Sequence, residues 1–73
     1  DLLAFVGGKR IGFEFKYTDS PKTTKSMHIA LEDLKLEHLY VIVPGKFRFP
    51  LTEQVTVVGL ELIGELAVMV KGS

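Results

Sequence analysis

Three charged residues near the start of the chain have the types and the spacing of a metal-assisted hydrolytic site. Twelve residues separate Asp1 from Glu14, and Lys16 follows two positions later. Two carboxylates can hold a divalent cation, and a nearby ammonium group can stabilise charge that develops on a phosphodiester. Whether the three residues act together depends on the elements that carry them.

The first two segments predict a β-hairpin. Residues Asp1–Val6 are short and mainly apolar, Gly7 and Gly8 follow, and Lys9–Tyr17 has apolar or aromatic side chains at every second position. Such alternation is typical of a strand. Two consecutive glycines favour a tight primed turn, because glycine accepts positive φ at both central positions.

The two-glycine turn also fixes the register of the hairpin. Counting outward from it pairs Asp1 with Glu14. Directly paired residues share one face of the sheet, with Cβ atoms roughly 4.5–5.5 Å apart. Lys16 lies two positions beyond Glu14 and faces the same way, and Gly12 leaves space on that face. The register therefore predicts that both carboxylates and the ammonium group converge.

Opposed carboxylates repel each other in a plain sheet, and Mg²⁺ or Mn²⁺ between them would remove the repulsion. We expect Asp1, Glu14 and the main-chain carbonyl of Phe15 to be the ligands. Lys16 would then orient the attacking water or neutralise the transition state. The alternative is a solvated strand face on which Glu14 and Lys16 form only a weak salt bridge.

The rest of the chain predicts an α/β fold, a sheet with a crossover helix in the order β-β-α-β-β. Apolar residues at three- and four-residue spacing indicate a helix from about Pro21 to Leu34, capped by Ser20. His38–Val43 is apolar on both faces and indicates a buried central strand. The remaining predictions are a loop or short extended piece at Lys46–Leu51, a strand at Gln54–Leu60 and a short helix at Glu61–Ala67.

Several other residues have both a functional and a structural interpretation. Lys22, Lys25 and Ser26, at the start of the helix, are candidate nucleic-acid contacts, because helix N-termini favour anions. Phe47 and Phe49 could stack on bases, although packing against the core is the favoured interpretation. Solvated side chains are the favoured interpretation for the two lysines and the serine.

Composition limits the function classes. The 73 residues predict a single domain, and the absence of cysteine excludes disulfides and thiolate metal sites. Nine basic and nine acidic residues cancel, which argues against a free-standing nucleic-acid clamp. The apolar run Leu39–Val43 is too short to cross a bilayer, so we expect a cytoplasmic protein without a membrane partner.

The pattern of Asp1 and Glu14-Phe15-Lys16, followed by a helix and an apolar strand, resembles the PD-(D/E)XK core of restriction-endonuclease-like proteins. The run EFKYTDSPKTTKSM with the strand LYVIVPG is similar to an uncharacterised C-terminal domain of prokaryotic AAA-type ATPases. The resemblance covers residues 1–60. It implies a nuclease-like domain with an ATPase domain in the parent chain, Asp1 and Glu14 as ligands of Mg²⁺ or Mn²⁺, and Lys16 as the catalytic lysine.

The chain departs from that core because it begins at the motif aspartate, without the family's first helix and strand. We therefore expect a truncated C-terminal domain that is inactive as an isolated fragment. A non-catalytic module that binds nucleic acid or protein is the second interpretation. The third is a homo-oligomer formed through an open sheet edge, since exposed edges pair with other chains.

Overall fold

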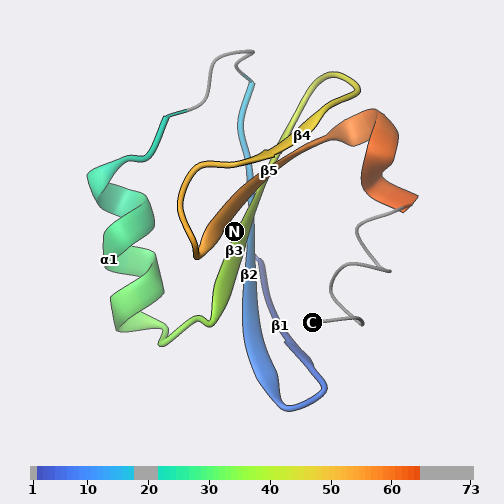
Figure 1. Ribbon diagram of the computed structural model, residues 1–73. Coiled ribbons are helices and arrows are strands. Elements are labelled where there is room, and N and C mark those ends of the chain that lie inside the picture. Colours follow the sequence, from blue (N-terminus) through green and yellow to red (C-terminus); the bar gives the residue numbers. More distant parts are fainter. Residues whose placement is uncertain (1, 18–21, 65–73) are drawn as a thin grey trace.

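The computed structural model describes residues 2–17 and 22–64. In this part of the chain, five strands form one sheet with both parallel and antiparallel pairs, in an α/β fold (Figure 1). The sheet order is β1-β2-β3-β5-β4, in which β2, β3 and β5 are parallel and the two edge strands are antiparallel to their neighbours. The elements are β1 (Leu2–Val6), β2 (Lys9–Phe15), α1 (Lys25–Asp33), β3 (His38–Val43), β4 (Arg48–Pro50), β5 (Val55–Gly59) and the 3-10 turn η1 (Leu60–Leu62).

The predicted hairpin is confirmed over the described residues. Val6 pairs with Lys9, and the register continues to Leu2 opposite Phe13. Both turn glycines have positive φ, 58° at Gly7 and 81° at Gly8, as a primed turn requires. The register that the two glycines predict is therefore the register of the structure.

The helix α1 is shorter than predicted. Thr24 is its N-cap, and the Thr24 side chain accepts a hydrogen bond from the backbone N–H of Met27 at 3.2 Å. The predicted start at Pro21 is therefore wrong, and Ser20, the predicted cap, lies outside the described residues. The helix ends at Asp33, and the Nε of Arg10 donates a 2.7 Å hydrogen bond to the free carbonyl of Leu34.

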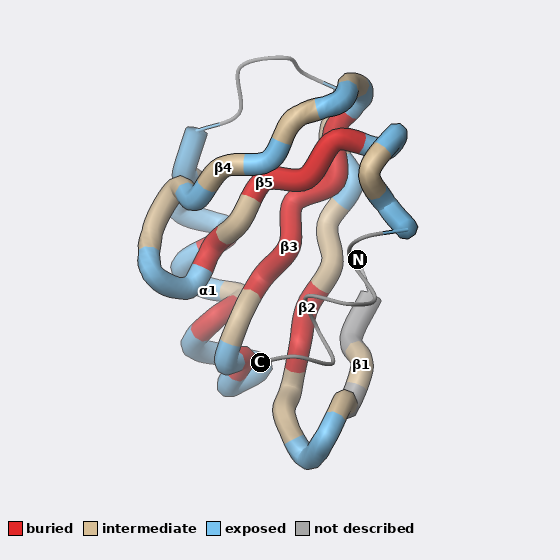
Figure 2. The backbone as a smooth tube through the Cα atoms, turned by 45° about the vertical axis from the view of Figure 1, so that its right-hand side comes forward, coloured by how far each residue is buried: buried red, intermediate tan, exposed pale blue. Residues whose placement is uncertain are grey.

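The central strand β3 is confirmed, and its side chains divide the core between two faces of the sheet. The helix face, on the side of α1, buries Met27, Leu31, Leu36, Leu39, Val41, Val43, Val55 and Val57. The opposite face buries Ile11, Tyr40, Ile42 and Val58. Figure 2 shows the buried backbone running along β3 and β5 and part of β2. Both faces of the sheet therefore contribute to the core.

The segment after β3 returns along the edge of the sheet. The predicted short extended piece is the strand β4, and the stacked rings of Phe47 and Phe49, with centroids 5.8 Å apart, pack against the helix-face core. The strand predicted at Gln54–Leu60 is confirmed as β5. The short helix predicted at Glu61–Ala67 begins one residue earlier as the 3-10 turn η1 and continues as α-helix at Ile63 and Gly64, and residues 65–67 lie outside the described part.

Gly59 provides a test of this packing. The backbone N–H of Gly59 donates to the carbonyl of Phe47 at 2.7 Å, and a Cβ at Gly59 would overlap the backbone carbonyl of Gly45. Backbone atoms cannot rotate away as a side chain can, so we expect Gly59→Ala to lower the free energy of unfolding by about 3 kcal/mol or more. Urea denaturation measures the change. Gly64→Ala is the control, because nothing lies within 4 Å of a Cβ at Gly64, and a comparable loss in both variants would contradict the prediction.

Candidate functional site at the carboxyl end of β2

The carboxyl ends of β2, β3 and β5 lie at the same end of the sheet, because the three strands are parallel. Ligands of open α/β sheets bind in the region outside these strand ends. Glu14 and Lys16 lie at the end of β2, where the backbone N–H of Lys16 still donates to the carbonyl of Ile42 at 2.9 Å. The fold thus places both predicted residues at the edge where such sites occur.

Glu14 and Lys16 form an ion pair with unequal partners. The Nζ of Lys16 lies 3.9 Å from Oε2 of Glu14, which is within ion-pair range but too long for a hydrogen bond. The Glu14 side chain is 19% exposed and that of Lys16 is 31% exposed. Oε2 of Glu14 is buried and has no hydrogen-bond partner among the described residues. A buried acceptor left in this state costs about 1–3 kcal/mol.

A small hollow of about 30 Å³ adjoins Glu14 on the helix face. Among the described residues, the only charged side chain in its wall is that of Glu14, and the other lining residues are Gly12, Phe13, Ala30, Leu34, Leu36 and Leu39. A space of this size holds a water molecule, which needs at least about 10–15 Å³. The hollow therefore has room for a single water molecule or a single ion that could partner the carboxylate.

The structure tests only part of the predicted ligand set. Asp1 lies outside the described residues, so its pairing with Glu14 stays a prediction, as does the role of the Phe15 carbonyl. The Phe15 side chain is 59% exposed and faces away from Glu14. No group of three histidine, aspartate or glutamate side chains able to hold a metal occurs within residues 2–17 and 22–64. Glu14 fits one position of a cation site, and further ligands must come from elsewhere.

The predicted nucleic-acid contacts lie around the start of α1. Lys22, Lys25 and Ser26 are all exposed, and neither lysine forms an ion pair with another described residue. The hydroxyl groups of Ser26 and Thr24 are 2.9 Å apart and share a hydrogen bond. Ser26 therefore belongs to the cap of the helix, whereas the two lysines remain available to a ligand.

A second polar cluster, which the sequence did not reveal, lies at the amino end of β3 on the opposite face. The Nε2 of His38 is 2.7 Å from the hydroxyl of Thr56, and its ring centroid is 4.7 Å from that of Tyr40. Phe13 stacks on Tyr40 at 5.8 Å. Burial lowers the pKa of His38 and raises the pKa of Tyr40, since desolvation disfavours the charged form of each. The spacing of His38 and Tyr40 on one strand was the available signal, but Thr56 is their neighbour only through the β3–β5 register.

Comparison with known proteins now places the chain. A family model described as a domain of unknown function, DUF4143, matches residues 1–63. The chain belongs to the DUF4143 family. It is 41% identical over 63 residues to the uncharacterized protein Rv2008c of Mycobacterium tuberculosis and, to the same extent, to the uncharacterized protein Mb2031c of Mycobacterium bovis. The match covers 86% of this chain but only 14% of each relative. No solved structure matches it.

The family match corrects the resemblance drawn from the sequence. The assignment to the PD-(D/E)XK proteins, and to the C-terminal domain of AAA-type ATPases, is wrong, because the model that matches is DUF4143 and neither mycobacterial relative supports a nuclease family. The mixed α/β sheet itself is confirmed, without the restriction-endonuclease-like assignment. Among the described residues, no helix of this DUF4143 chain has the length and apolar character needed to cross a membrane.

His38 gives this chain a predicted pH dependence. Its pKa is lower in the folded state than the unfolded value of about 6.5, so at pH values between the two the unfolded state binds more protons. The stability that neutral His38 contributes to the folded state is complete above about pH 6.5 and is lost as the pH falls through the lowered pKa of the folded state. We expect urea denaturation from pH 7.5 to pH 5 to show a smaller loss of stability for His38→Gln than for the parent. His28→Gln, on the exposed helix surface, is the control, and an unchanged pH profile in His38→Gln would refute the prediction.

Proposed function

We propose that Glu14 and Lys16 form part of a divalent-cation site that supports phosphodiester hydrolysis in the full-length protein. The observation that carries the proposal is the buried Oε2 of Glu14, which has no hydrogen-bond partner among the described residues, in a residue that lines a hollow large enough for one ion. A cation offsets the desolvation of a carboxylate oxygen more strongly than a neutral water can. The position at the carboxyl end of β2 supports the same proposal.

Each residue has a role that follows from its position. Glu14 supplies a carboxylate oxygen that burial has already stripped of water, so ligand binding there needs little further desolvation. Lys16 lies close enough to attract an anionic substrate, and its partial exposure leaves the ammonium group accessible to a phosphate. A divalent cation, when bound, lowers the pKa of its water and stabilises charge on the phosphate.

The substrate class proposed is nucleic acid, with Lys22 and Lys25 as phosphate contacts. Both are exposed near the amino end of α1, where the helix dipole also favours anions. The net charge of zero gives the chain little long-range attraction for a polyanion. Other parts of the full-length protein would therefore have to deliver the substrate.

A non-catalytic interaction module is the second candidate function. Its support is a set of exposed large apolar side chains near the same edge of the sheet, Phe15, Tyr17, Leu60 and Ile63. In this case, Glu14 and Lys16 would be only an ion pair, and a water in the hollow would hydrogen-bond the carboxylate. The two candidates differ in whether a divalent cation binds.

Cation binding has a measurable effect on stability. At 100 times its dissociation constant, Mn²⁺ or Mg²⁺ should stabilise the folded protein by about 2.7 kcal/mol, because the ligand binds only the folded state. Glu14→Gln should abolish this stabilisation while retaining the shape of the side chain. Thermal unfolding with and without cation measures both, and Glu53→Gln, in the exposed turn before β5, is the control that should behave like the parent.

Hydrolysis is tested separately on the full-length protein, with single-stranded and double-stranded DNA and RNA and the same variants. Cation-dependent cleavage that is lost in Glu14→Gln and in Lys16→Met supports the proposal. If the cation binds but no nucleic acid is cleaved, the site binds a cation without supporting hydrolysis. If neither the parent nor Glu53→Gln is stabilised by either cation, the proposal fails and the interaction module is the better interpretation.

A further inference from the structure

The sheet has one face that α1 covers and another that is only partly covered. Side chains on the helix face pack against Met27 and Leu31 of α1 and against the aromatic pair of the β4 segment. On the opposite face, Phe13 and Leu62 pack against the buried core. Toward the carboxyl ends of the strands the described residues no longer cover this face, and large apolar side chains are exposed. We call this region the apolar patch and define it as the exposed residues Phe15, Tyr17, Leu60 and Ile63.

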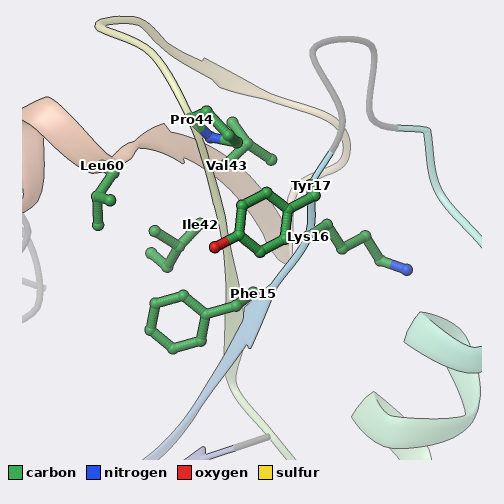
Figure 3. A pocket seen from close by; sticks show the side chains of 7 residues that line it. All are labelled: Phe15, Lys16, Tyr17, Ile42, Val43, Pro44 and Leu60. Atoms are coloured by element: carbon green, nitrogen blue, oxygen red, sulfur yellow. The ribbon is translucent and has the colours of Figure 1, made fainter.

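Exposure and shape both mark the apolar patch as a binding surface. Phe15 is 59% exposed, Leu60 52% and Ile63 44%. An open hollow of about 120 Å³ lies between Phe15, Ile42 and Leu60, with Pro44 in its wall (Figure 3). For comparison, a cavity of about 150 Å³ takes benzene, so this hollow matches one large aliphatic side chain.

Lys16 is among the residues that line this hollow, but its ammonium group does not face into it. Figure 3 shows that the side chain of Lys16 points away from Phe15 and toward the side of α1. The ring of Phe15 and the side chain of Leu60 lie on the other side of the strands. A partner of this patch must therefore offer apolar side chains and cannot rely on an ion pair with Lys16.

Parallel strands restrict what that partner can be. Sheets of parallel strands have both faces covered, and the covering elements are helices. Here β2, β3 and β5 are parallel, yet among the described residues the opposite face is packed by Leu62 of the short turn η1 and by no longer helix. The chain corresponds to only 14% of the length of its mycobacterial relatives, so such proteins have ample further chain to supply one.

We propose that the apolar patch is the docking surface for an amphipathic helix that belongs to the same full-length polypeptide and lies outside these 73 residues. One large aliphatic side chain of that helix fills the hollow beside Phe15, and neighbours at three- and four-residue spacing contact Leu60 and Ile63. The proposal rests on residues other than Glu14 and Lys16, and it does not depend on the proposed cation site.

Site-specific photocrosslinking of the full-length protein tests the proposal. Benzoylphenylalanine replaces Phe15 in one variant and Leu60 in a second, so that the test survives if one of them fails to fold. Ile29, which is 47% exposed on α1, is the matched control position outside the apolar patch. Mass spectrometry of the digested protein identifies the crosslinked peptide.

The proposal predicts an intramolecular crosslink from positions 15 and 60 to one peptide outside the 73-residue segment, with apolar residues at helical spacing. The control at position 29 should not give that crosslink. A crosslink between two molecules that disappears on dilution would assign the patch to a second copy and overturn the proposal. Crosslinks confined to residues 1–73, or no crosslink from either position, would overturn it as well.

Discussion

The burial of β3 on both faces governs the rest of the structure. Every residue from Leu39 to Val43 is at most 5% exposed, and the strand pairs in parallel with β2 on one side and β5 on the other. Each fully buried side chain of this size stabilises the fold by about 1.5–3 kcal/mol. A strand inside a parallel sheet cannot be reached by a tight turn, so its two flanking connections must be long. The first contains α1, and the second contains β4.

These two connections produce the asymmetry of the sheet. Both the helix α1 and the aromatic pair Phe47 and Phe49 pack against the helix face. The close approach of the β4 segment is possible because Gly59 has no side chain where the Gly45 backbone crosses it. Among the described residues, the opposite face receives Leu62 of η1, Val6 of β1 and the aromatic contact of Phe13 with Tyr40. The same geometry that buries β3 therefore leaves, at the carboxyl end of the sheet, a small hollow beside Glu14 on one face and exposed apolar side chains on the other.

Features determined by residues that are neighbours in the sequence could be predicted, whereas contacts between residues far apart in the sequence could not. Gly7 and Gly8 fixed the hairpin register, because turn type alone determines it, and the doubly apolar HLYVIV run identified β3. The start of α1 was predicted too early because Ser20 and Thr24 are both good caps, and only the packing of Met27 and Leu31 selects between them. His38 and Thr56 meet through a parallel register that no local pattern encodes. The resemblance to the PD-(D/E)XK proteins was wrong because its Glu-x-Lys motif is short and common on strands.

The energetic weight of Glu14 is large for a chain of this size. Native stability is roughly 0.05–0.15 kcal/mol per residue, so 73 residues have about 4–11 kcal/mol in total. A buried acceptor without a partner, at about 1–3 kcal/mol, would remove a substantial part of it. A glutamine or an aliphatic residue at position 14 would occupy similar space next to Gly12 without burying a charge. Retaining a carboxylate there is consistent with a compensating ligand, and the ammonium group of Lys16 at 3.9 Å satisfies the charge only in part. Among the described residues no other group supplies the remaining compensation, and for that reason the oxygen, rather than the ion pair, is the informative atom of this site.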